Sequence, residues 1–573
     1  MGLMGPGCNL FLTVMLAAGP IPQQTPAPAK AVTAPRTWVA PPPSGPQSPV
    51  PAVAASAPHA PAQPRLGPFR TARLAPADAT VFLHVERAGR LRRDLAPRPI
   101  ARSIDSIVGG GAFGRSWIAL AQSLKLDEGA LFDVCFGREF TYIGRGDGSW
   151  AVVTEFGSDG EERVREMLRA LQVRVREPRF SLAVSELPEQ DVLIASDGGQ
   201  VVIGPTKQPQ AFYAVLQRWG GAPDGDQKIP VLATDAQFLQ RLGELKCDAL
   251  RADVAAFVRH ERPLGGCSMI VADVRGDDVE IKHAARFDNP LLAAPVTKLK
   301  CDFSPLGLVS KSALVAIMQP RDVGDGPMET FLSASLGVGL ISPDMRSNLA
   351  DRRMLIMGEA DARQLPEARD ILTTTFVACL EAKDGTQAGP QLDAQMSRLT
   401  KRLNDLGQGA FLIRMPDTAA LRTSEARQAD LGGAGQWFTG GFPVMKAVSL
   451  NWTVAQGPEG AAWYLVGSNP QALQEAVAAL GQPCERDERM VGQFDSCGLA
   501  NGQRLGRHLQ SWSDEAAEFT DPQHVEQVRQ TLRTFANLAA GIQDCRWQMA
   551  RPTANTMRLE VQMKLAPAVT AEN

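Results

Sequence analysis

The chain has 573 residues, of which 44% are apolar, and a formal net charge of -3 at pH 7. One hydrophobic core does not extend over so long a chain, so we expect several domain-sized units. The near balance of charge argues against a nucleic-acid-binding protein and against a polybasic membrane-surface protein, because both recruit their partners with a strong basic field.

The first residues have the features of a secretory leader. An apolar run from Leu10 to Ala18 has the length of a signal-peptide core and is too short to cross a bilayer. Small residues at 17–19 offer a cleavage site, although no Lys or Arg precedes the run and Pro20 would follow the cut. We therefore predict a signal peptide over 1–19 and an exported protein, periplasmic or secreted, with no transmembrane helix after the leader.

Low-complexity sequence is expected to flank the folded part. Residues 20–68 are dominated by Pro, Ala, Gln and Ser, so they cannot bury enough apolar surface to fold and favour extended conformations. We predict a disordered linker over 20–68 and a disordered tail over 567–573.

Short apolar runs alternate with amphipathic segments between these ends, which is typical of an α+β protein. In chain order the first half is predicted to contain a strand at 81–86, a strand at 130–136, a hairpin over 140–156, a helix at 251–257 and a closing hairpin over 268–286. The second half is predicted to contain a strand at 310–318, a helix at 392–406, and two alternating strands at 545–549 and 557–565.

One stretch of the first half returns in the second. Residues 201–216 contain an apolar run, Gly204, a Pro-Gln-Ala sequence and an amphipathic helix, and residues 463–477 repeat that order around Gly467. Lys207 has no counterpart in the second stretch, so the repeat indicates architecture, a strand-to-helix joint, rather than a ligand loop.

Other correspondences suggest insertions in the second half. The offset is 233 residues between Val81 and Leu314, 263 between the two glycines, and 278 between Cys267 and Cys545. We place the largest insertion near 391–441.

The predicted fold is α+β with two related domains, each an antiparallel sheet covered by helices, after the disordered tether. The first copy spans 69–302 and the second 303–566. Two unrelated α+β domains remain the alternative.

Cysteine usage fits an oxidising compartment only in part. Eight of the nine cysteines would remain after removal of the leader, which is an even number. Cys135 and Cys379 lie in apolar runs, where a free cysteine behaves as a small hydrophobe. Cys484 and Cys497 flank a polar loop and are the first candidates for a disulfide.

The sequence offers no catalytic, cofactor-binding or metal-ligating residues that we can assign. A glycine cluster at 109–114 matches the dinucleotide fingerprint by letter, but the segment before it has helical spacing, so a helix–helix loop is the better interpretation. The histidines lack zinc-site spacing, and there is no Gly-x-Ser-x-Gly motif. Trp437, in a glycine-rich segment, is the candidate exposed aromatic for binding an unknown partner such as an envelope protein or polysaccharide.

The segment 74–80, Leu-Ala-Pro-Ala-Asp-Ala-Thr, precedes an apolar strand. Together with the leader, the tether and the Gly204 and Gly467 blocks, it resembles uncharacterised secreted proteins of planctomycete-type bacteria over about residues 70–566. The resemblance implies an exported, duplicated α+β protein and supplies no site residues.

Two functions follow as hypotheses. The first is a non-catalytic binding or scaffold module of the cell envelope, suggested by the tether and the repeat. The second is an envelope hydrolase that uses Asp and Glu residues between the two copies, since the separation of a carboxylate pair is a property of the fold.

Overall fold

The structure is a computed structural model. It describes residues 71–76, 78–100, 122, 126–156, 162, 165–166, 169, 174–175, 183–187, 192–197, 199–221, 253–259, 265–289, 296–311, 313–323, 341–359, 374–407, 412–416, 426–430, 449–457, 461–520 and 522–568. The predicted leader, linker and glycine cluster lie outside these residues, as do Trp437 and most of the tail.

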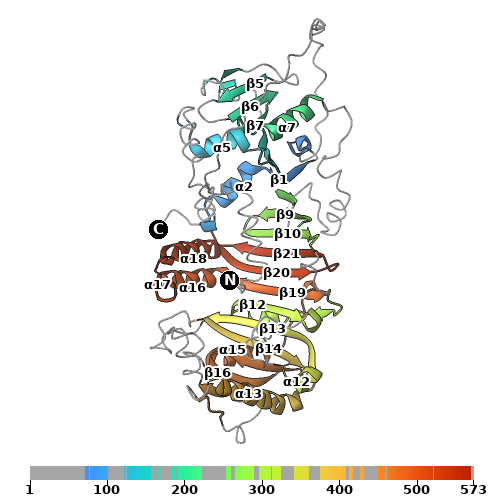
Figure 1. Cartoon of the computed structure of the whole chain (residues 1–573), viewed down its shortest axis with the longest axis vertical. Coiled ribbons are helices and arrows are strands. Elements are labelled where there is room, and N and C mark those ends of the chain that lie inside the picture. Colours follow the sequence, from blue (N-terminus) through green and yellow to red (C-terminus); the bar gives the residue numbers. More distant parts are fainter. Residues whose placement is uncertain are drawn as a thin grey trace, which may run out of the picture.

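The described strands form an elongated antiparallel sheet that runs the length of the molecule (Figure 1). In spatial order the 19 strands of this sheet are β4 (Arg174–Val175), β5 (Ala183–Leu187), β6 (Val192–Asp197), β7 (Gln200–Pro205), β3 (Trp150–Glu155), β2 (Glu139–Arg145), β1 (Ala79–Glu86), β8 (Val254–Arg259), β9 (Cys267–Arg275), β10 (Asp278–Arg286), β21 (Thr556–Leu565), β20 (Ile542–Ala550), β19 (Ser496–Asn501), β12 (Ala313–Pro320), β13 (Leu349–Glu359), β14 (Thr374–Ala382), β17 (Ala462–Gly467), β16 (Ser449–Gln456) and β15 (Arg427–Asp430). A small second sheet pairs β11 (Cys301–Asp302) with β18 (Val491–Gly492).

Helices connect and cover these strands. In chain order they are η1 (Thr71–Leu74), α2 (Ala88–Leu95), α5 (Glu128–Phe136), α7 (Gln210–Gly221), α10 (Leu306–Val309), η5 (Arg321–Val323), α12 (Pro343–Asn348), α13 (Gly385–Gly407), α15 (Pro470–Leu480), η10 (Glu488–Met490), α16 (Gly502–Asp514), α17 (Ala516–Phe519) and α18 (Val525–Ala540). The fold is therefore mixed α+β around an antiparallel sheet, as predicted.

The pairing of β10 with β21 joins the two halves of the sheet, with Lys282 opposite Glu560. Both strands alternate polar and apolar residues, so their polar side chains lie on one face and their apolar side chains on the other. We call the face that bears Phe82 and Met318 the front face, and the opposite face, which bears Leu83, the back face. Strands from both predicted domains thus belong to one sheet, whereas the sequence predicted a separate sheet for each.

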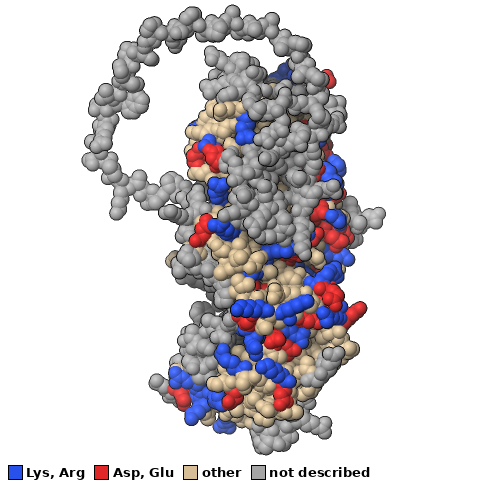
Figure 2. Space-filling model, turned by 90° about the vertical axis from the view of Figure 1, so that its right-hand side faces the viewer, with Lys and Arg blue, Asp and Glu red and all other residues tan. Residues whose placement is uncertain are grey.

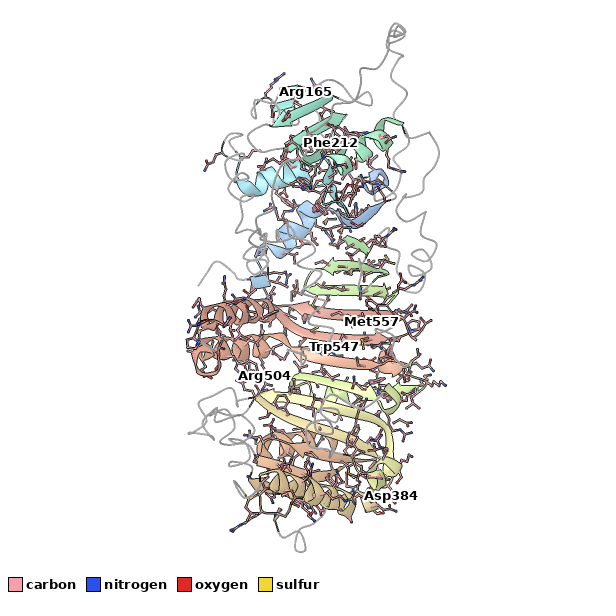
Figure 3. The ribbon with its side chains drawn as sticks, viewed as in Figure 1. Arg165, Phe212, Asp384, Arg504, Trp547 and Met557 are labelled. Atoms are coloured by element: carbon pink, nitrogen blue, oxygen red, sulfur yellow. The ribbon has the colours of Figure 1, made fainter. Side chains whose placement is uncertain are left out.

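In each half a helix that follows a glycine packs on the front face. In the first half α7 buries Phe212, which is labelled in Figure 3, against β7. In the second half α15 buries Leu473 against β14 and β17. A Cβ on Gly204 would lie 2.6 Å from the Cβ of Phe212, and one on Gly467 would lie 3.5 Å from Cδ1 of Leu473. The approach at Gly204 requires a glycine, whereas 3.5 Å is an ordinary contact distance. A helix follows the strand at both positions, which confirms a strand-to-helix joint at each.

The back face is covered by several helices. The helix α2 packs on a cluster around Ile281, α5 on a cluster around Val201, and α13 on a cluster around Trp452 and Tyr464. The predicted helix at 392–406 is confirmed as the main part of α13, whose buried residues include Leu392 and Leu399.

Two predicted elements are wrong. Residues 130–136, predicted as a strand, form the end of α5, because the side chain of Asp127 accepts a hydrogen bond from the backbone N–H of Ala130 and caps the helix. Within 251–257, predicted as a helix, residues 254–257 form part of β8, which is paired on both sides by β1 and β9. In both cases neighbouring structure overrides an ambiguous short apolar run.

Close helix packing on α16 gives a first prediction. A Cβ on Gly506 would lie 2.7 Å from the carbonyl oxygen of Ala536 and 2.8 Å from the amide nitrogen of Ala540, both in the backbone of α18. We expect Gly506→Val to lower the free energy of unfolding by about 1–3 kcal/mol, because the backbone cannot move aside cheaply. Chemical denaturation measures this. The exposed Arg507→Val should cost much less, and equal losses in the two variants would contradict the packing argument.

A buried histidine gives a second prediction. His84 lies in the front core with its Nδ1 2.9 Å from Oγ1 of Thr141, and burial lowers the pKa of His84 to about 3. The native state keeps the ring neutral while the unfolded chain protonates near the ordinary pKa of 6.5, so stability falls as pH drops from 6.5 toward 3. At pH 5 the titration of His84 lowers the free energy of unfolding by about 2 kcal/mol.

Urea denaturation at pH 7 and pH 5 tests this, with His84→Gln as the comparison. The wild type should lose more stability between the two pH values than the variant does. Identical losses would show that His84 does not titrate in this way.

Candidate binding cavity

A cavity of about 260 Å³ opens on the back face in the second half of the sheet, where η5, α12, β13 and β14 meet. Its lining consists of four arginines and four aliphatic residues: Arg321, Arg346, Arg352, Arg353, Ile341, Leu349, Ala350 and Leu380. Arginines and aliphatic residues therefore line one partly open space.

A capping hydrogen bond and the buried side-chain amide of Asn348 fix α12 beside the cavity. The side chain of Ser342 accepts a hydrogen bond from Met345 N, and Pro343 occupies the first turn, so α12 begins at this point. The helix ends at Asn348, whose side chain exchanges hydrogen bonds with the backbone of Asp384 and donates to Tyr464 Oη at 2.9 Å. This anchors the chain as it turns from α12 into β13.

An irregularity in β13 forms part of the cavity wall. Leu349 lies opposite Ala382 and Arg353 lies opposite Leu380, so the β13 segment is longer than the β14 segment that it faces. Such a β-bulge bends the strand and redirects its side chains. The bulge contains Ala350 and Arg352, which line the cavity.

Two of the arginines are held by specific contacts. Arg321 donates to the carbonyl oxygen of Leu349 at 2.7 Å and lies 3.9 Å from a carboxylate oxygen of Asp351. Arg352 donates to Glu381 through Nε at 2.9 Å and lies 5.6 Å from the ring centre of Trp463, which is itself buried. These contacts preorganise the guanidinium groups, and preorganised Arg is well suited to planar anionic groups.

The predicted disulfide is not formed in the structure. Cys484 and Cys497 are both free thiols. Cys497 is buried in the front core beside Met318 and Leu499, and burial raises the pKa of its thiol, whereas Cys484 is only partly buried in the loop after α15. The polar loop between them contains η10 and β18, and β18 pairs with β11 rather than bringing the two thiols together.

Carboxylates do lie where the halves meet, on the front face. Glu280 has Lys282 as an ion-pair partner at 2.9 Å, and Glu560 pairs with Arg558. On the side of the molecule shown in Figure 2, basic and acidic side chains are intermixed. This arrangement is typical of a solvated sheet surface.

The sequence alone did not reveal the cavity, because its arginines come from three elements and no motif links them. No described helix is long and apolar enough to cross a membrane. Trp437, the candidate exposed aromatic, lies outside the described residues.

Comparisons with known proteins add little. No family model and no curated protein match the chain. Among solved structures, the chain is similar to crystal forms III, I and IV of TP0453, at 11%, 11% and 12% identity and a TM-score of 0.24 in each case. The matches cover 42%, 52% and 52% of this chain and 85%, 94% and 95% of the matched chains. Likeness at this level carries no argument about function.

Proposed function

We propose that this protein is an exported, non-catalytic binding module of the cell envelope, built from two related halves that share one sheet. The lining of the cavity is the observation that carries the proposal. Its residues are arginines and aliphatics, and arginine stays protonated in proteins, so none of them can serve as a nucleophile or as a general acid or base near neutral pH. Such a cavity is suited to holding a ligand.

The strand order supports two related halves. Outward from the β10–β21 pair, one side reads β9, β8, β1, β2, β3, β7, β6 and β5, followed by the short β4. The other side reads β20, β19, β12, β13, β14, β17, β16 and β15. Each half places its front helix directly after its Gly-containing strand, β7 or β17. Copies that meet edge to edge through equivalent antiparallel strands would give this order.

Strand register supports the same relation. Phe82 lies opposite Ile143 and Phe257. In the other half Ala316 lies opposite Ile356 and Leu499. These two rows occupy matching strands and the same face.

The ends of the central pair also correspond. Phe287 N donates to the carbonyl oxygen of Asn555 at 2.9 Å, and Leu565 N donates to that of Asp277 at 2.7 Å. The donors and the acceptors are each 278 residues apart (565 − 287 and 555 − 277). If the two halves were exchanged, each of these two hydrogen bonds would take the place of the other.

The strand register changes two of the residue offsets that the sequence suggested between the halves. Cys267 on β9 belongs to the front core and Cys545 on β20 to the back cluster. These two residues are therefore not equivalent, although the offset of 278 holds at the ends of β10 and β21. The rows above match Phe82 with Ala316, an offset of 234 (316 − 82), one more than the sequence suggested. A slip of one residue moves a side chain to the other face of a sheet, and apolar runs alone do not show it.

A sedimentation assay tests binding against hydrolysis. We expect the purified protein to sediment with an insoluble envelope fraction and to release no soluble sugar or peptide fragments. Release that disappears in Glu280→Gln or Glu560→Gln would overturn the proposal in favour of a hydrolase acting between the halves.

Export is tested separately. The proposal rests on the apolar run before residue 20, so the mature protein should lack 1–19 and should be found outside the cytoplasm. N-terminal sequencing after cell fractionation measures both, and an intact leader on a cytoplasmic protein would overturn this part.

A further inference from the structure

We propose that the cavity binds a small organic oxyanion, a phosphate or carboxylate that carries a compact apolar group. This inference rests on the proposed binding function and specifies its ligand. The lining divides into cationic and aliphatic side chains, and the two classes recognise different parts of one molecule. Arg binds oxyanions through paired N–H donors, and the aliphatic wall gains free energy by covering apolar surface.

The position of the cations favours an anion at the wall formed by η5 and α12. Arg321 begins η5 and Arg346 lies in the last turn of α12, so the two approach the cavity from separate elements. Arg353 comes from β13, across from Leu380 on β14. Guanidinium groups on three elements can surround an oxyanion, whereas an exposed row on one helix would be an ordinary solvated face.

The apolar residues favour a ligand larger than an inorganic ion. Ile341, Leu349, Ala350 and Leu380 line the same space as the arginines, and the volume of about 260 Å³ exceeds what a single phosphate fills. A bare anion would leave the aliphatic wall in contact with water.

The first half does not repeat this site. By the register given above, Phe140 on β2 takes the position of Arg353 on β13, since Phe140 lies opposite Val85 and Arg353 opposite Gln319. Phe140 packs against Phe136, with the ring centres 5.4 Å apart. Among the described residues, aromatic packing in the first half thus takes the place that Arg353 has in the second half.

Calorimetric titration with phenyl phosphate tests the inference, with inorganic phosphate and phenol as partial ligands. We expect phenyl phosphate to bind at least about ten-fold more tightly than either, because only it uses both walls; ten-fold corresponds to about 1.4 kcal/mol. Equal affinity for inorganic phosphate would overturn the role of the apolar wall, and no binding of phenyl phosphate would overturn the inference.

Charge variants locate the binding. Arg346 is exposed on α12, so Arg346→Glu should fold normally and raise the Kd for phenyl phosphate about ten-fold or more. Arg321→Gln, which keeps a donor for Leu349, should weaken binding to a lesser extent. Arg533→Glu, at a half-exposed arginine on α18, is the matched control and should leave the Kd within about two-fold. Equal effects of Arg346→Glu and Arg533→Glu would overturn the assignment to this cavity.

The same titration separates this inference from the proposed function. Release of phenol, followed by absorbance, would support an anion site but overturn the non-catalytic function. Failure of phenyl phosphate to bind, with the envelope fraction still sedimenting the protein, would overturn the ligand class and leave the binding function standing.

Discussion

Replacing Asp253 with alanine should lower the free energy of unfolding by about 3–5 kcal/mol. The carboxylate is fully buried and accepts hydrogen bonds from Arg87 at 3.0 Å, from Arg90 at 2.5 Å and from the backbone N–H of Val274 at 2.9 Å. Removal leaves the backbone N–H of Val274 without this acceptor and takes the buried counter-charge from Arg87 and Arg90, of which Arg90 keeps Asp94 at 3.9 Å. Urea denaturation followed by circular dichroism measures the change.

The geometry around Asp253 suggests why the loss is large. Arg87 has φ of 53°, a left-handed backbone conformation that is uncommon for residues other than glycine, and its ion pair with Asp253 helps to hold the turn from β1 into α2. Asp94→Ala is the matched control, because Asp94 also contacts Arg90, at 3.9 Å, but is partly exposed. A loss below about 1 kcal/mol in Asp253→Ala, the size expected of an exposed pair, would contradict the argument.

Phe212→Ala should cost a similar amount, about 3–5 kcal/mol, because it removes a fully buried aromatic ring from the front core of the first half. The neighbouring β7 strand cannot collapse into the space, since its contact with the helix is made by the backbone at Gly204. Thermal and chemical unfolding measure the loss.

The control for Phe212 lies on the same helix. Gln217→Ala changes an exposed position of α7 and should alter stability by less than about 0.5 kcal/mol. If Phe212→Ala were equally mild, α7 would not be packed on the sheet as described.

Local chemistry accounts for the elements that the sequence predicted well. The hairpin of β2 and β3 was predictable because Gly148, with φ of 80°, supplies the backbone that its turn requires. The strand-to-helix joints were predictable because Gly204 and Gly467 each lie at the end of an apolar strand, a few residues before a proline and a helix.

Other features depend on pairing between distant segments. The pairing of β10 with β21 was not predictable, because the alternating pattern of a strand does not identify the strand that it pairs with. The α16–α18 helices were missed, although Asn501, whose side chain caps α16 by accepting from Arg504 N, was a usable signal. The cavity depends on the bulge after Leu349, which no local pattern marked.

The place of β21 in the sheet affects how the chain can be made. This strand is the last in sequence, yet it lies at the centre of the sheet, between β10 and β20. A ribosome must therefore produce the chain as far as residue 565 before β10, formed some 270 residues earlier, can meet its partner. Until then the nascent first half exposes an unpaired strand edge, so synthesis itself creates a period in which a chaperone, or rapid export, would protect the chain from aggregation.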